Sequence, residues 1–148
     1  MQKINIRNAT KEDLPAIHDL VRHLAVFEKA EASFTAELEE YASLFEDNRF
    51  FVSVAEVDGV IRGMTLYYLT FSTWKGSMMY LEDFIVEKGF RGLGIDQLLF
   101  DETLRRAKEK GCKLLKWEVL DWNEGAVRFY ERNNAIIEKE WWDGKIFL

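Results

Sequence analysis

The sequence predicts a single-domain α/β fold whose mixed, mostly antiparallel sheet is flanked by helices. Strand-like segments with alternating or continuous apolar residues are interspersed with segments whose apolar residues recur every three to four positions, as in one-sided helices. The 148 residues fit one domain, and no repeat, low-complexity tract or interdomain linker interrupts them. An apolar content of 48 % and an aromatic content of 14 % are typical of a chain with a proper core.

The predicted order is a strand, two helices, three strands, a helix, a strand, a helix and a closing strand pair. The expected strands span residues 4–8, 50–57, 60–71, 80–86 and 113–119, and the expected helices span residues 10–28, 35–47, 97–110 and 123–134. Residues 136–148 are expected to form a closing hairpin or strand pair around Asp143-Gly144.

Local signals set these boundaries. Thr10 followed by Asp13 resembles a capping box at the start of the first helix, and Thr35 is the expected N-cap of the second. Asp58-Gly59 is a strong two-residue hairpin turn between the second and third strands. Gly111 follows the third helix as a C′ glycine does.

A glycine-rich turn with Arg91, Gly92 and Gly94 joins the buried strand at 80–86 to the amphipathic helix behind it. Unpaired backbone N–H groups and the positive end of the helix dipole meet at such a point, and glycine lets a ligand approach the backbone. The turn therefore suggests a phosphate site. Glycines also occur in such turns for packing reasons alone. The pattern is neither a Walker A loop nor a dinucleotide fingerprint.

Charge and composition argue against several classes of function and favour a cationic ligand. The net charge of −6 argues against nucleic acid as the main partner and agrees with a cationic ligand. One cysteine allows no internal disulfide, and two histidines allow no Cys/His metal cluster, so we expect no metal. Cys112 is expected to be a buried structural thiol and not a nucleophile. Without a signal-peptide pattern or an apolar run near ~20 residues, a cytosolic protein with no membrane partner is expected.

The turn Arg-Gly-Leu-Gly-Ile-Asp resembles the acetyl-CoA loop of the GNAT N-acetyltransferases, and the later Trp-Asn-Glu…Phe-Tyr segment is similar to another part of that superfamily. The spermidine/spermine (diamine and thialysine) acetyltransferase branch is the nearer resemblance. The matching segments are Ile6–Thr10, Phe27-Glu28, Tyr67–Trp74, Tyr80–Val86, Arg91–Ile95 and Trp122–Tyr130. The resemblance implies direct acetyl transfer from acetyl-CoA to a primary amine of a polyamine, diamine or lysine analogue.

The resemblance implies two proton-transfer residues. Tyr130 matches the tyrosine that protonates the departing CoA thiolate, and a phenol with a reference pKa of about 10 suits that role. Glu82 matches the carboxylate that draws a proton from the incoming amine through water. The alternatives are a core tyrosine with a satisfied hydroxyl and an exposed strand carboxylate.

The expected substrate contacts are Phe27, Glu28, Trp74, Glu82 and Glu118. Carboxylates pair with ammonium groups, and an aromatic face adds a cation–π term of roughly 0.5–2 kcal/mol. For Glu118, which no family position supports, a solvated strand charge is an equal alternative.

The resemblance also implies where acetyl-CoA binds: strand backbone groups on the pantetheine arm, turn N–H groups on the pyrophosphate, and an asparagine near the far end of the arm. The expected residues are Phe84, Ile85, Val86, Arg91, Gly92, Leu93, Gly94, Ile95, Asp96, Asn123 and Ala126.

Asp96 departs from the family pattern, which has glycine or alanine at this position. A carboxylate at the lip of an anion site repels pyrophosphate, although aspartate is also a favoured residue near a helix N-terminus. We expect weakened acetyl-CoA binding, and a non-catalytic binding protein of the same fold is the alternative function. The apolar tail predicts burial in a homodimer through Trp141, Trp142, Ile146 and Phe147.

Overall fold

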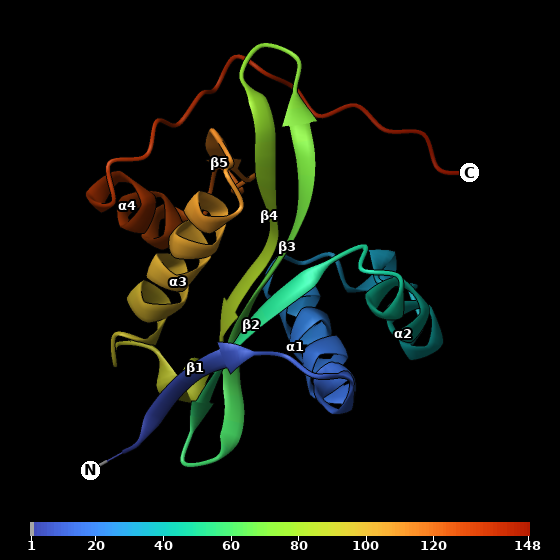
Figure 1. Cartoon of the computed structure of the whole chain (residues 1–148), viewed down its shortest axis with the longest axis vertical. Helices are drawn as coiled ribbons and strands as arrows, with labels where there is room; N and C mark the ends of the chain where they lie inside the picture. Colours follow the sequence, from blue (N-terminus) through green and yellow to red (C-terminus); the bar gives the residue numbers. More distant parts are fainter. Residues whose placement is uncertain (1) are drawn as a thin grey trace. The chain divides into compact units, whose positions relative to one another are not determined.

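In the computed structural model, which describes residues 2–148, five strands form one sheet in the order β1-β2-β3-β4-β5 (Figure 1). The strands are β1 (Ile4–Asn8), β2 (Phe51–Val57), β3 (Val60–Ser72), β4 (Gly76–Val86) and β5 (Leu114–Lys116). The first three neighbouring pairs are antiparallel, and β4 pairs with β5 in parallel. The predicted mixed, mostly antiparallel sheet is confirmed.

Contacts between residues divide the chain into two units, Met1–Trp117 and Glu118–Leu148. The first unit contains the sheet and three α-helices, and the second contains α4 (Glu124–Arg132). The expectation of one domain over residues 1–148 stays a prediction.

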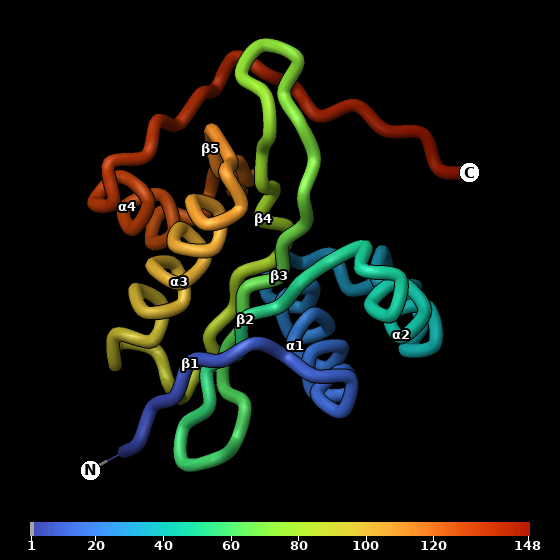
Figure 2. The backbone as a smooth tube through the Cα atoms, viewed as in Figure 1, coloured from blue at the N-terminus to red at the C-terminus, as the bar shows by residue number. Residues whose placement is uncertain are grey.

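Within the first unit, helices cover both faces of the sheet (Figure 1, Figure 2). Helices α1 (Leu14–Phe27) and α2 (Leu38–Glu46) lie on one face, and α3 (Ile95–Glu109) lies on the other. The core cluster under α1 contains Leu14, Ile17, Leu20, Phe50, Val52, Val54, Met64, Leu66 and Ile85. The cluster under α3 contains Ala55, Val57, Val86, Ile95 and Leu99.

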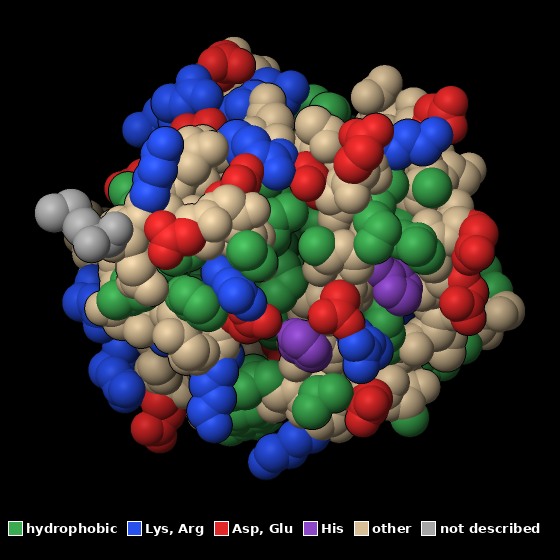
Figure 3. Space-filling model, turned by 90° about the horizontal axis from the view of Figure 1, so that it is seen from below, with side chains coloured by type: hydrophobic (Ala, Val, Ile, Leu, Met, Phe, Trp, Pro, Cys, Tyr) green, Lys and Arg blue, Asp and Glu red, His purple; other side chains and the backbone are tan. Residues whose placement is uncertain are grey.

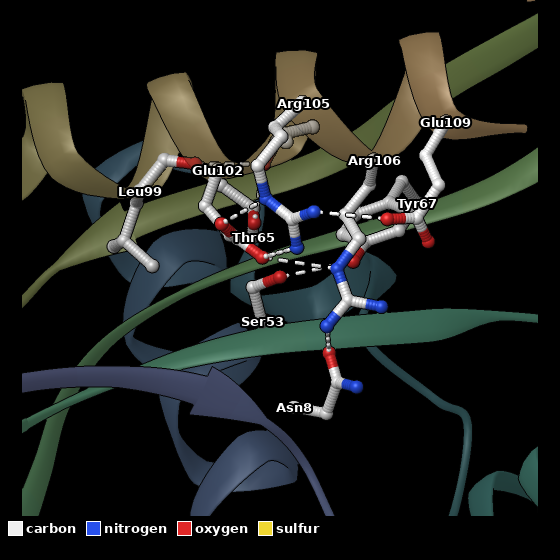
Figure 4. Close-up of polar contacts among 10 residues, drawn as sticks. Asn8, Ser53, Thr65, Tyr67, Leu99, Glu102, Arg105, Arg106 and Glu109 are labelled. Carbon is white, nitrogen blue, oxygen red and sulfur yellow. Dashed lines mark hydrogen bonds and ion pairs between the residues drawn. The ribbon is translucent and has the colours of Figure 1, made fainter.

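Buried hydroxyl groups fix α3 on its face of the sheet (Figure 4). The Thr65 and Thr103 hydroxyl oxygens lie 2.8 Å apart, and Thr103 also donates to the Leu99 carbonyl at 2.8 Å. On the neighbouring strand the Ser53 hydroxyl lies 2.9 Å from the Tyr67 hydroxyl. Because a buried hydroxyl without a partner is costly, the Thr65–Thr103 pair favours one register of α3 on the sheet, and the Ser53–Tyr67 pair favours one register of β2 on β3.

Helix α2 begins at Leu38, later than the predicted start and N-cap at Thr35, and that boundary prediction was wrong. Residues 34–37 carry no helix because the chain there contacts α1. The His18 ring nitrogen Nε2 lies 2.9 Å from the Ala36 carbonyl oxygen, and the His18 ring centre lies 4.9 Å from that of Phe34. A contact distant in sequence therefore overrides the local capping signal.

The end of the chain also differs from the prediction. Strand β5 covers only Leu114–Lys116 of the expected 113–119, and residues 135–148 of the described chain form no strand. Trp141 and Trp142 are 74 % and 92 % exposed. A two-stranded hairpin is marginal in water unless further strands or a helix support it, so the Asp143-Gly144 signal alone does not produce one.

Acidic, basic and apolar side chains are all present on the face shown in Figure 3. Across residues 2–148, no helix has both the length and the apolar character that a membrane span requires.

Candidate active site

A β-bulge interrupts β4 at Glu82. Leu66 of β3 pairs with Asp83, and the next residue, Tyr67, pairs with Leu81, so Glu82 is the extra residue between two paired positions. A bulge of this kind redirects side chains and is frequent next to active sites.

The bulge reverses which face of the sheet the side chains of β4 occupy. Before it, Met79 packs with Ala107 of α3. After it, Ile85 packs with Leu14 and Ile17 of α1. In a regular strand, two residues an even number of positions apart would share one face. The residue inserted at the bulge accounts for the change.

As a result, the consecutive carboxylates Glu82 and Asp83 both face the α1 side. The Tyr68 hydroxyl donates to Glu82 Oε1 at 3.2 Å, and the Tyr68 ring packs against the core cluster under α1. Asp83 lines a cleft together with residues of α1. Without the bulge, one of the two carboxylates would face α3.

The cleft has a volume of about 190 Å³. Its described lining residues are Val21, Leu24, Ala25, Glu28, Ala30, Ser33, Phe34 and Asp83. The wall is largely apolar, and the charged groups among these residues are two carboxylates. A ligand with an apolar chain and a positive charge suits such a surface.

The carboxylates of the cleft influence one another. Burial, followed by the charges of Glu82 and Glu28, raises the pKa of Asp83 to about 7. Burial also raises the pKa of Glu28. On α2, burial and then the charges of Asp83 and Glu82 raise the pKa of Tyr41 to about 12. A cation in the cleft would offset this concentration of negative charge.

One of the expected substrate contacts, Trp74, lies away from the cleft. Trp74 is 86 % exposed at the turn of the β3–β4 hairpin. The strand from Gly76 to Asp83 spans roughly 23 Å at about 3.3 Å per residue. Trp74 therefore does not reach the cleft of its own chain. Glu118 is exposed and belongs to the second unit.

Phe27 ends α1 next to Glu28 and contacts the glycine-rich turn. The Arg91 guanidinium carbon lies 5.3 Å from the Phe27 ring centre, and Arg91 Nε donates to the Val86 carbonyl at 3.0 Å. Arg91 therefore joins the end of β4 to the end of α1, and Phe27 supplies a ring face to this arginine.

The turn before α3 needs glycine at two positions. Gly92 and Gly94 have φ angles of +80° and +83°, which strain other residues, and a Cβ added at either position would meet no atom within 4 Å. Leu93 lies exposed between them, and Ile95, the first residue of α3, is buried. The backbone at this point is open to a ligand, and the first N–H groups of α3 have no partner within the helix.

Asp96 uses one of these first-turn donors. The Gln97 backbone N–H donates to Asp96 Oδ1 at 2.8 Å. The carboxylate therefore occupies a backbone donor in the first turn of α3, and the expected effect of Asp96 on an anion bound there stays a prediction.

The strand residues expected to contact the pantetheine arm lie at the end of β4. Parallel pairing with β5 covers Met78–Tyr80, and β4 continues beyond it through Phe84, Ile85 and Val86. The Phe84 ring stacks on Phe100 of α3 at 6.1 Å between ring centres.

In the second unit, α4 carries Tyr130, which is buried, and its ring meets Phe129 edge to face at 5.6 Å. Asn123 is the N-cap of α4 and accepts a hydrogen bond from the Ala126 N–H at 3.3 Å. Ala126 lies in the first turn of this helix.

Sequence reasoning missed Asp83 and the tyrosines beside it, Tyr41 and Tyr68. The available signal was the Glu82-Asp83 pair itself, two charges in an otherwise apolar strand. Because strand neighbours ordinarily point to opposite faces, the sequence alone gives them no common site. Within residues 2–148, the structure contains no group of three or more His, Cys, Asp or Glu side chains that could hold a metal ion.

Comparison with known proteins identifies one protein family over most of the chain. A model of the acetyltransferase (GNAT) family matches residues 14–135, across both units. The thialysine N-epsilon-acetyltransferase of Mus musculus is 35 % identical and aligns over 96 % of this chain and 91 % of its own length. The L-ornithine N5-acetyltransferase NATA1 of Arabidopsis thaliana is 26 % identical, over 92 % of this chain and 81 % of its own.

Among solved structures, an aminoglycoside acetyltransferase from an uncultured soil metagenomic sample, in complex with trehalose, has a TM-score of 0.82. It covers 98 % of this chain and 96 % of its own, at 21 % sequence identity. At that identity the likeness establishes the fold.

Proposed function

The chain belongs to the GNAT family of acetyltransferases, and on that premise we propose that it acetylates a primary amine of a small cationic molecule. The family implies acetyl-CoA as the co-substrate. A polyamine, a diamine or a lysine analogue such as thialysine is the proposed acceptor. The observation that carries the proposal is the cleft, in which Glu28 and Asp83 lie beside an apolar wall.

The turn before α3 fits acetyl-CoA as the acetyl donor. Because Gly92 and Gly94 carry no side chain, a ligand can approach the backbone of the turn. The positive end of the α3 dipole favours a pyrophosphate at this point. Arg91 adds a positive charge beside this backbone. The other proposed contacts are Leu93, Ile95 and Asp96 at the turn, the strand segment Phe84–Val86, and Asn123 with Ala126 on α4.

The acidic cleft fits the amine. A substrate ammonium group would pair with Glu28, and Val21, Leu24 and Phe34 would contact its carbon chain. The cleft gathers several carboxylates. Binding a cation there should therefore be more favourable than forming a single surface ion pair, which usually contributes less than about 1 kcal/mol.

Proton transfer requires a base and an acid. An amine with a pKa near 10.4 must lose its proton before it attacks, at a cost of roughly 4–5 kcal/mol at pH 7. Glu82, exposed on β4 and held by the Tyr68 hydroxyl, would draw that proton through water. Tyr130 would return a proton to the leaving thiolate.

A homodimer is part of the proposal. The tail leaves Trp141, Trp142, Ile146 and Phe147 exposed, an apolar segment of the kind that marks interaction surfaces. Because Trp74 lies far from the cleft of its own chain, it would contact an acceptor only from a second copy. Sedimentation of the purified protein tests this directly, and a monomer at micromolar concentration would contradict it.

The function is tested by measuring thiol release from acetyl-CoA in the presence of a panel of amines. The panel contains 1,4-diaminobutane, spermidine, thialysine, ornithine and lysine. Butylamine, which has one amine and no second charged group, is the control. We expect release with at least one diamine or lysine analogue, and mass spectrometry should find one added acetyl group. In the same assay Tyr130→Phe is expected to lower kcat by about 10²-fold. No release with any amine, together with no acetyl-CoA binding by calorimetry, would favour the non-catalytic alternative to which Asp96 points.

A further inference from the structure

Two neighbouring carboxylates of β4 lie on the same side of the sheet and differ in exposure. Glu82 is exposed and accepts a hydrogen bond from the Tyr68 hydroxyl at 3.2 Å. Asp83 is half-buried in the cleft that Glu28 also lines. The β-bulge at Glu82 produces this arrangement, so the pair is a product of the strand geometry.

We propose that Glu82 and Asp83 act as one proton acceptor, in which Glu82 receives the proton that the amine loses and Asp83 holds it. The proposal rests on the acetyl transfer proposed above and deepens it by adding Asp83 as a positioning residue that acts through Glu82. Two carboxylates that share a site hold one proton more readily than a single one does.

The electrostatics of the cleft support this assignment. The groups that face Asp83 are Glu82 on its own strand, Glu28 at the end of α1, and Tyr41 on α2. None of these three is basic, and the cleft residues Ser33 and Phe34 add no charge. The titratable ring packed against Tyr41 and Phe34 is His18 of α1, whose ring centre lies 4.9 Å from each of theirs. Burial and the two carboxylates raise the pKa of Asp83 to about 7, near the pH at which a general base is most effective.

The proton balance is simple. One N–H bond of the substrate ammonium breaks and one O–H bond forms on the carboxylate pair, whose charge falls from two negative to one. The nitrogen lone pair then forms the C–N bond at the acetyl carbonyl, the C–S bond breaks, and the thiolate takes the Tyr130 proton. The second proton that the nitrogen loses passes through water and restores Tyr130. After transfer the pair releases its proton to water, which restores the doubly ionised form without any oxidant or reductant.

The pH dependence of kcat/KM tests the pair, with the preferred amine of the panel as acceptor. The parent should show a limb with an apparent pKa near 7, below the limb near pH 10 that belongs to the amine itself. Asp83→Asn should lose the limb near pH 7 and about 10²-fold in kcat. Glu82→Gln should lower kcat and move the limb to lower pH, because one charge that raises the pKa of Asp83 is gone. Glu46→Gln, an exposed carboxylate on α2, is the control and should match the parent.

Opposite behaviour of the two variants would overturn the proposal: the limb kept in Asp83→Asn and lost in Glu82→Gln assigns the proton to Glu82 alone. Carboxyl-carbon NMR of Asp83 gives a second measurement that does not depend on turnover. A titration of Asp83 near pH 7 that moves to lower pH in Glu82→Gln supports the pair, and a titration near pH 4 in the parent contradicts it. Circular dichroism and acetyl-CoA calorimetry check that both variants fold and bind the donor. A parent without turnover would instead contradict the proposed function.

Discussion

The acidic cleft and the glycine-rich turn are built in different ways, although both belong to the first unit. Residues adjacent in sequence form the turn, and the positive φ angles of Gly92 and Gly94 give it its shape. The cleft combines Glu28 from the end of α1, Asp83 from a bulged strand and a loop before α2. A local motif therefore encodes the turn, whereas tertiary packing assembles the cleft.

The two regions also carry opposite electrostatic character. The turn offers backbone N–H groups, the positive end of α3 and Arg91, whereas the cleft offers Glu28 and Asp83. An anionic pyrophosphate and a cationic amine would each meet a matching environment. Substitutions in one region should therefore change one ligand's binding and leave the other's nearly unchanged.

The largest expected effect is a gain of stability in the cleft. Asp83 has a folded-state pKa of about 7 against an ordinary value of 3.8, so the folded chain keeps its proton where the unfolded chain has lost it. Stability therefore falls as pH rises from about 4 to about 7. A difference of about three pKa units corresponds to about 4 kcal/mol, so Asp83→Asn should stabilise the protein by up to about 4 kcal/mol at pH 8, with almost no effect at pH 4.

Urea unfolding at pH 4, 6 and 8 measures this difference, and Glu46→Gln serves as the surface control. A stability difference that stays constant across the three pH values would contradict an elevated pKa for Asp83. A stabilised but slow variant would also agree with strain held at a catalytic position.

Next in size is the effect of strain in the turn. Gly94→Val places a β-branched residue at a φ of +83°, where backbone strain costs about 1–2 kcal/mol. Acetyl-CoA affinity by calorimetry should fall about fivefold to thirtyfold. Gly89→Val is the matched control, because Gly89 has no positive φ and its Cβ would meet open space. Equal losses in both variants would argue against a specific role for Gly94.

A smaller effect is expected at Asp96. Asp96→Gly removes a carboxylate from the anion site and should tighten acetyl-CoA binding by about fivefold, while the loss of a helix-end interaction lowers the melting temperature slightly. Asp96→Asn keeps an oxygen for the Gln97 N–H without the charge and should lie between the two. Equal affinities for the parent and Asp96→Gly would end this explanation.

The smallest effect concerns the contact between the end of α1 and the glycine-rich turn. Phe27→Leu removes the ring under Arg91, a contact worth about 0.5–1 kcal/mol at an exposed site. Acetyl-CoA binding should weaken twofold to fivefold, and Phe27→Tyr, which keeps the ring face, should bind like the parent. If the amine KM changes in place of the acetyl-CoA affinity, Phe27 contacts substrate, as the family resemblance implies.

Local signals predicted the parts of the fold that depend on neighbouring residues. The hairpin at Asp58-Gly59, the C′ glycine at Gly111 and the turn before α3 are all present, because each needs a residue that tolerates a positive φ. The start of α2 was missed because His18 on α1 contacts Ala36. No local sequence pattern predicts such a contact.

The candidate site shows the same limit. Glu82 and Glu28 were expected to be substrate or catalytic residues on the strength of a family pattern, and the structure brings both close to Asp83. Asp83 received no role, because only the bulge at Glu82 turns both carboxylates toward α1. The register of β3 on β4 that creates this bulge depends on packing on both faces of the sheet.

The most direct test of the account compares a diamine with a monoamine of equal chain length. The ratio of kcat/KM for 1,4-diaminobutane over butylamine should exceed about tenfold in the parent, since each 1.4 kcal/mol of extra interaction is tenfold. In Glu28→Gln that ratio should fall toward one while the acetyl-CoA affinity stays within about twofold of the parent. A ratio unchanged by Glu28→Gln would show that the acidic cleft does not select a cationic acceptor.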